Sequence, residues 1–167
     1  MKYLMRERIF GFGEDHWIRD EHDDKVFLVD GKSLRIRETF ELKDAETRET
    51  LLEVKKRLLS FRDRMNIERD GDTIATVHKK LLHLFRDKYL VEFEDGVTPD
   101  IEITGNFLDH EYQLEQEGRR IAQVSKKWFS FRDTYAIDVE EGVDVPLVLA
   151  VAVCVDHLEA EDKPGEQ

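Results

Sequence analysis

The chain has 167 residues, which is the length of one domain and enough to enclose a substantial core. It is 40% hydrophobic and 38% charged, with a formal net charge of −12 at pH 7. The acidic balance argues against general nucleic-acid binding, because phosphate contacts require a basic field. The sequence lacks both an apolar run long enough for a transmembrane helix and the apolar segment of a signal peptide. We therefore expect a cytoplasmic protein, and its single cysteine, Cys154, excludes an internal disulfide.

A short motif recurs along the chain. LLSFRD at 58–63 returns as LLHLFRD at 81–87 and as WFSFRD at 128–133, with weaker copies at 9–15, 33–38 and 105–111. Anchors at Phe12, Leu34, Phe61, Phe85, Leu108 and Phe131 are 22, 27, 24, 23 and 23 residues apart. Six near-equal units indicate one small motif copied into an array or a closed ring. The fifth copy, GNFLDHE, departs most, since it lacks Phe-Arg-Asp.

Each copy is predicted to form a β-hairpin. After an opening strand within 2–10, two runs of alternating apolar and polar residues flank each polar turn. The turns lie at 22–24, 45–46, 70–72, 94–96, 117–118 and 140–142. The clearest is Asp70-Gly71-Asp72, because an Asp-Gly turn between alternating runs is a strong hairpin signal. These elements predict about a dozen strands in meander order.

The last predicted element is the apolar run at 146–155. A meander of about twelve strands avoids exposed edges by closing, and the resulting lumen is too wide for the strands' own side chains to fill. Asp144 and Pro146 favour a helix start, and a helix that is apolar on all sides must be buried on all sides. The valines of this run favour a strand, so a buried strand is the alternative.

These elements define the predicted fold class. We expect a mainly β protein, a closed twelve-stranded antiparallel barrel of six hairpin repeats around a buried hydrophobic C-terminal helix at about 145–158. One domain spans 1–158, and 159–167 is predicted to be a disordered tail. Cys154 then lies in the core as a small hydrophobe.

The repeat, the FSFRD-type motifs and the hydrophobic C-terminal segment resemble the LURP-one-related family, in its small prokaryotic branch. MKYLMRERIFGFGEDHWIRDE at the start and KKWFSFRDTYAI later carry the likeness, which covers about 1–158. The resemblance implies a tubby C-terminal-like fold, a closed barrel around a central hydrophobic helix. It implies no enzyme activity. Membrane tethering or phosphoinositide binding is inferred for some relatives, but no motif here aligns with their binding residues.

The predicted meander separates two kinds of charge. Hairpin turns lie at one end of the barrel, the hairpin rim, and connections between hairpins lie at the other, the connection rim. The hairpin rim collects acidic residues: Asp23, Asp24, Glu46, Asp70, Asp72, Glu94, Asp95, Glu115, Glu117, Glu140 and Glu141. The connection rim collects basic residues: Lys32, Lys55, Lys56, Lys79, Lys80, Lys126, Lys127, Arg62, Arg86 and Arg132. These cations are the candidate site for an anion or a lipid headgroup.

A structural interpretation of the same charges is open. Turns need solubilising charge, and lysines protect strand ends against edge pairing. The Arg-Asp pairs at 62–63, 86–87 and 132–133 are further candidates for ion pairs that close the ring. The recurring aromatic residues of the connections, such as Phe61 and Phe131, are predicted to plug the end of the lumen.

We predict no catalytic, metal or cofactor site. The histidines show no metal-ligand spacing, and the turn at Asp70 lacks the remaining ligands of an EF-hand. The predicted function is a non-enzymatic binding or scaffold module that docks anionic phospholipid or a membrane surface, so that it is cytoplasmic or peripheral to the membrane. A protein partner is a further prediction. The alternatives are a protein-interaction adaptor and a cryptic carboxylate-based small-molecule enzyme.

Overall fold

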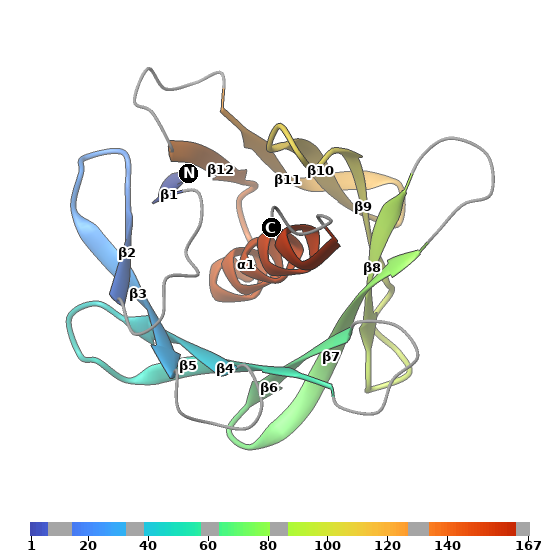
Figure 1. Ribbon diagram of the computed structural model, residues 1–167, viewed down its shortest axis with the longest axis horizontal. Coiled ribbons are helices and arrows are strands. Elements are labelled where there is room, and N and C mark those ends of the chain that lie inside the picture. Colours follow the sequence, from blue (N-terminus) through green and yellow to red (C-terminus); the bar gives the residue numbers. More distant parts are fainter. Residues whose placement is uncertain (7–14, 33–38, 58–63, 81–86, 127–133, 163–167) are drawn as a thin grey trace, which may run out of the picture.

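A computed structural model describes residues 1–6, 15–32, 39–57, 64–80, 87–126 and 134–162. In them, twelve strands form a closed antiparallel barrel, and a helix runs through its middle (Figure 1). The strands are β1 (Lys2–Arg6), β2 (Asp15–Arg19), β3 (Lys25–Lys32), β4 (Thr39–Asp44), β5 (Thr50–Lys56), β6 (Arg64–Arg69), β7 (Asp72–Lys80), β8 (Lys88–Phe93), β9 (Ile101–Asn106), β10 (Glu111–Gln116), β11 (Arg119–Ser125) and β12 (Thr134–Val139). The helix α1 spans Val145–Asp162. The predicted fold class is confirmed.

The repeated unit is a bulged hairpin. Asp70 and Gly71 between β6 and β7 both have positive φ, 52° and 88°, as the two-residue turns that match strand twist require. In four hairpins the register shifts shortly before the turn, after Ile18, Leu42, Ile67 and Leu114. A bulge increases local twist and bends the strand. Repetition of this bulge around the sheet is the geometry that closes a barrel.

The turn at 140–142 differs from the hairpin turns, because the chain then enters α1 instead of another strand. β12 pairs with β1 from the opposite end of the chain, with Lys2 opposite Asp138 and Arg6 opposite Thr134. The amino group of Met1 also donates a hydrogen bond to the Val139 carbonyl at 2.9 Å. The sixth strand pair therefore joins the two ends of the sheet.

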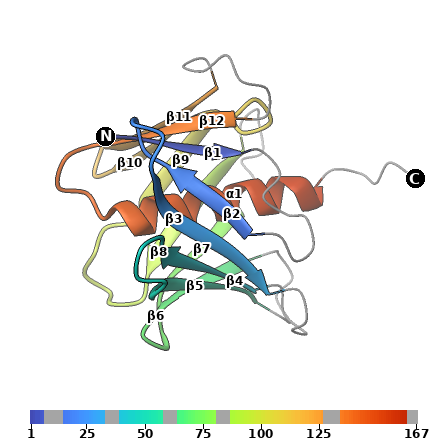
Figure 2. The ribbon, with the colours of Figure 1, turned by 90° about the vertical axis from the view of Figure 1, so that its left-hand side faces the viewer.

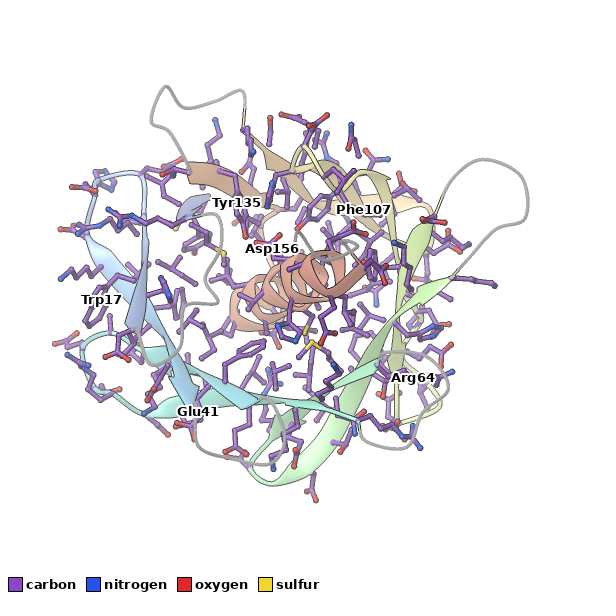
Figure 3. All side chains as sticks on the ribbon, in the orientation of Figure 1. Trp17, Glu41, Arg64, Phe107, Tyr135 and Asp156 are labelled. Atoms are coloured by element: carbon purple, nitrogen blue, oxygen red, sulfur yellow. The ribbon has the colours of Figure 1, made fainter. Side chains whose placement is uncertain are left out.

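Strand alternation directs one row of side chains toward the helix and one row outward. In β5, Leu52 and Val54 are at most 1% exposed, whereas Glu53 between them is half-buried on the outer face. Figure 3 shows the same division around the wall: Phe107 and Tyr135 point into the lumen, where Asp156 of α1 lies, and Trp17, Glu41 and Arg64 lie outside. The core is thus one layer of inward side chains wrapped around α1.

The predicted helix start is confirmed at Asp144. The Asp144 carboxylate accepts a hydrogen bond from the Leu147 amide at 3.2 Å, which caps the first turn. The Arg69 guanidinium on β6 holds the other carboxylate oxygen at 2.8 Å. Every residue of 147–158 is buried, as expected for a helix that is apolar on all sides. A buried strand at 146–155 is excluded.

The helix is longer than predicted. Residues 159–162, which the sequence predicts to belong to the disordered tail, continue α1 beyond the buried segment. Figure 2 shows the helix crossing the barrel and ending at the connection rim. The described residues contain no helix with the length and apolar content needed to cross a bilayer.

The fifth connection is a tight turn at 107–110 between β9 and β10, which accounts for its divergent sequence. Phe107 points inward and meets the Tyr89 ring edge-on, with centroids 4.8 Å apart, whereas the repeat anchor Leu108 is 61% exposed. Gly105 precedes the turn with φ 142°, and a Cβ there would lie 2.4 Å from the Glu111 carbonyl oxygen. Only glycine fits this close approach. The other predicted aromatic plugs, such as Phe61 and Phe131, lie outside the described residues.

Candidate functional site

The lysines predicted for the connection rim separate onto the two faces of the wall. Lys56 continues the inward row of Leu52 and Val54 on β5, and Lys79 continues the inward row on β7. Their neighbours Lys55 and Lys80 are one residue away and therefore point outward. The sequence pattern predicts all four lysines at the connection rim. Strand alternation gives the two members different environments.

The inward lysines contact the end of the helix. Lys79 Nζ lies 3.1 Å from Glu159 Oε1 and 2.8 Å from Asp162 Oδ2, and also 3.4 Å from Asp87 Oδ2. Lys56 Nζ pairs with the Glu161 carboxylate. The last turn of α1 is thus bound to β5 and β7. Carboxylates at a helix C-terminus oppose the helix dipole, so these wall cations compensate for an unfavourable local sequence.

Tyr89 on β8 completes this contact. Its hydroxyl donates a hydrogen bond to Glu159 Oε1 at 2.7 Å, and Lys79 Nζ lies 5.8 Å from the centre of its ring. Burial, followed by the neighbouring Glu159 carboxylate, raises the pKa of Tyr89, so the phenol remains a donor. Burial by itself would lower the pKa of Lys79, but its hydrogen bonds to Asp162 and Glu159 outweigh this and raise it. Lys79 is therefore a permanent cation at neutral pH.

A second polar cluster lies deeper in the lumen. Asp156 of α1 accepts a hydrogen bond from the Tyr135 hydroxyl, and His110 Nε2 lies 3.1 Å from its other carboxylate oxygen. The His110 and Tyr135 rings stack with centroids 4.5 Å apart. Within the described residues, His110 Nδ1 and the Tyr112 hydroxyl are buried without a hydrogen-bond partner. Burial, followed by Asp156, raises the pKa of Tyr112 well above its ordinary value.

The outward lysines lie in a different setting. Lys55 Nζ is held between Glu68 at 2.9 Å and Glu53 at 3.2 Å, and these hydrogen bonds raise its pKa. Lys80 is exposed, and no ion pair to it occurs among the described residues. The Lys126 amide donates to Glu111 Oε1 at 3.0 Å, beside the Ser125 hydroxyl at 2.9 Å. Of these outward lysines, Lys55 is therefore neutralised by its two glutamate partners.

The other predicted site residues are not placed. Arg62, Arg86, Arg132 and Lys127 lie outside the described residues, as does the side chain of Lys32. Anion binding by this set stays a prediction.

Sequence reasoning missed the acidic half of the site. The sequence predicts a tail for Glu159, Glu161 and Asp162, and it indicates no role for Tyr89 or His110. The available signal was the strand period, which places Lys56 and Lys79 in the rows that face the helix.

The opposite rim is acidic, as predicted. The described turns there expose Asp23, Asp24, Glu46, Asp70, Asp72, Glu94, Asp95, Glu117, Glu140 and Glu141, and Glu115 is half-buried. Three ion pairs involving arginine are described at this rim: Arg19 with Asp23, Arg69 with Asp144 and Arg120 with Glu140. The helix begins here with its positive dipole end, so the charge separation of the barrel follows the helix axis.

An open groove of about 560 Å³ lies on the outer face of β8 to β11. Its carboxylates are engaged, since Glu102 pairs with Lys88 at 3.1 Å and Glu111 accepts from Ser125. Gln113 and Gln123 line the same groove. Among the described residues no group of three or more His, Cys, Asp or Glu side chains is arranged to hold a metal ion.

Comparisons with known proteins identify the family and the fold. Residues 1–156 match the sequence model of the family described as LURP-one-related. The uncharacterized protein YxjI of Bacillus subtilis (strain 168) is 26% identical over 163 residues, which cover 98% of this chain and 96% of that protein. The X-ray structure of a protein from Arabidopsis thaliana superimposes with a TM-score of 0.69 at 16% identity, over 95% of this chain and 91% of that one. This last likeness concerns the fold, a tubby-like barrel.

Proposed function

The chain belongs to the LURP-one-related family, and from that premise we propose that it is a non-enzymatic binding module that docks an anionic lipid surface through the connection rim. The observation that carries the proposal is the arrangement of Lys79, Lys56 and Tyr89, which already hold carboxylate oxygens at this end of the barrel. Ammonium and phenol donors of this kind also bind phosphate oxygens.

The distribution of charge supports a planar partner. A rim is the edge of a ring, so a flat surface can reach several of its positions at once. The protein carries −12 overall, but the acidic turns gather at the hairpin rim, away from the proposed contact. An anionic surface would attract the connection rim and repel the hairpin rim, which orients the molecule before contact.

The test is sedimentation of the full chain with vesicles of phosphatidylglycerol and phosphatidylcholine at rising salt. We expect binding at low ionic strength that weakens as salt screens the contact. Lys80→Gln combined with Lys126→Gln should weaken it, because both positions lie at the connection rim. Arg119→Gln is the control, since Arg119 is exposed at the hairpin rim. The absence of binding at low ionic strength would refute the proposal.

A carboxylate-based small-molecule enzyme is the second candidate function. The groove on the outer face supports it, because Glu102, Glu111 and Asp87 line one open surface there. Turnover of a small polar substrate that is lost in Glu102→Gln, with vesicle binding unchanged, would favour it. The protein-interaction adaptor is the third prediction. A stoichiometric partner that survives high salt and competes with vesicles would favour that role.

A further inference from the structure

We infer that Lys56, Lys79 and Tyr89 form an anion-binding site inside the connection rim, and that residues 159–162 of α1 occupy it as a removable substitute for an external anion. The inference rests on the proposed function for the source of that anion. It adds a regulatory contact, because the carboxylates of residues 159–162 compete with the external anion for Lys56, Lys79 and Tyr89.

The contacts resemble those of a bound ligand. One carboxylate oxygen of Glu159 receives both the Tyr89 hydroxyl at 2.7 Å and the Lys79 ammonium at 3.1 Å. Asp162 adds a second oxygen 2.8 Å from the same ammonium, and Glu161 meets Lys56 beside it. The wall thus presents two cations and one neutral donor to a set of anionic oxygens, while Asp87 supplies a further carboxylate 3.4 Å from Lys79. A phosphate group presents oxygens of the same charge and hydrogen-bonding character.

The last turn of α1 is the part of the helix that can dissociate from the wall most easily. Residues 147–158 are buried, Glu159 is half-buried, and 160–162 are exposed. The side chains of Glu161 and Asp162 are 24% and 48% exposed, so their ion pairs are partly screened by water. Three carboxylates at the C-terminal end of a helix also oppose its dipole. Fraying of this turn leaves the buried part of α1 in place.

The ligand class follows from the donors. Glu161 pairs with Lys56, and Glu159 and Asp162 pair with Lys79, so the ligand expected in their place is an anion with several oxygens, such as a phosphate monoester or diester. A lipid headgroup and a free phosphate share this chemistry. Vesicles and inorganic phosphate are therefore separate arms of the test.

The experiment compares the full chain with Glu161→Gln/Asp162→Asn, which neutralises the two carboxylates that follow Glu159 and keeps the Tyr89–Glu159 hydrogen bond. The matched control is Asp72→Asn/Glu141→Gln, which makes the same change of net charge at exposed positions of the hairpin rim. Binding is measured with phosphatidylglycerol vesicles and, separately, with inorganic phosphate. Adding Lys56→Gln to the first variant tests the site itself, because its Glu161 partner is already neutral. Asp162→Asn alone serves if the double variant fails to fold.

We expect the helix-end variant to bind vesicles about threefold to tenfold more tightly than the wild type, the control to change little, and Lys56→Gln to remove the gain. Equal vesicle binding by wild type and helix-end variant would overturn the inference and leave the proposed function intact. Phosphate binding by the helix-end variant without vesicle binding would refute the lipid function and support the site. Failure of the helix-end variant to bind either probe would overturn the inference.

Discussion

At residue scale, Lys79 shows how one side chain connects distant parts of the chain. Its ammonium lies within 4 Å of Asp87, Glu159 and Asp162, from a connection and from the helix. Its neighbour Lys80 points outward and is exposed. Two adjacent lysines therefore have different roles, because strand geometry places them on opposite faces.

Replacing Lys79 should destabilise the fold more than replacing Lys80. Lys79→Ala leaves Glu159 and Asp162 without their cation, which should lower the free energy of unfolding by about 1–3 kcal/mol. Lys80→Ala should change it by less than about 0.5 kcal/mol. Urea denaturation followed by circular dichroism measures both. Equal losses would contradict the assignment of the two lysines to different faces.

Gly105 and Gly31 form a second contrast. Gly105 has φ 142° and no room for a Cβ, whereas nothing lies within 4 Å of a Cβ built at Gly31. Gly105→Ala should lower the free energy of unfolding by about 2–4 kcal/mol, through backbone strain and contact with Glu111. Gly31→Ala should stay within about 1 kcal/mol of the wild type. Thermal unfolding of both variants tests this. A wild-type melting temperature for Gly105→Ala would contradict the close contact between the backbone at Gly105 and the Glu111 carbonyl oxygen.

At element scale, α1 has two different ends. Its start is capped by Asp144, and its buried middle fills the lumen. These two parts of the helix make no use of the ion pairs at the connection rim. Its last turn is acidic, which is unfavourable near the negative end of the dipole. That turn persists through the wall groups Lys56, Lys79 and Tyr89. The helix end is therefore the part of the element that solution conditions should affect first.

Alkaline pH should weaken the contact between helix and wall. The folded-state pKa values of Tyr89 and Lys79 lie above the ordinary values of 10.0 and 10.5, so the unfolded chain loses these protons first as pH rises. Their contribution to stability is complete below pH 10.0 and is lost above it. Tyr89→Phe should flatten the fall in unfolding free energy above pH 10.0 by up to about 1.4 kcal/mol per pH unit. Urea titrations at several alkaline pH values check this, and an unchanged slope would contradict it.

At the scale of the whole molecule, the barrel is a continuous wall whose first and last strands pair. β1 is held to β12 over five residue pairs, so neither strand leaves an open edge at this junction. The lumen is occupied by α1, and Cys154 lies at its centre without exposure. Access to this thiol requires the barrel to open or the helix to leave.

Labelling of Cys154 should therefore report global unfolding. Burial raises the pKa of the thiol, which further suppresses the reactive thiolate. A disulfide reagent at about pH 8 should react slowly with the native protein and at a rate that rises with urea in parallel with loss of β-structure. K80C in a Cys154→Ala background should react at once, since position 80 is exposed. Rapid labelling of native Cys154 would contradict the closed, filled barrel.

Sequence alone determined the repeated hairpins and the occupant of the lumen. Alternating apolar and polar residues on both sides of a turn such as Asp70-Gly71 predict a β-hairpin. The run at 146–155 is apolar on all sides, so it must be buried. It also placed a basic set at one rim, although it took Lys55 with Lys56 and Lys79 with Lys80 as equivalent members.

Only the tertiary structure decided which charges meet. Lys56 and Glu161 are 105 positions apart, and Lys79 and Asp162 are 83 apart. No local pattern encodes such contacts, because they depend on the length of α1, its rotation about its own axis and the strand that faces each turn. Packing of the buried helix sets all three, and the site at the connection rim follows from it.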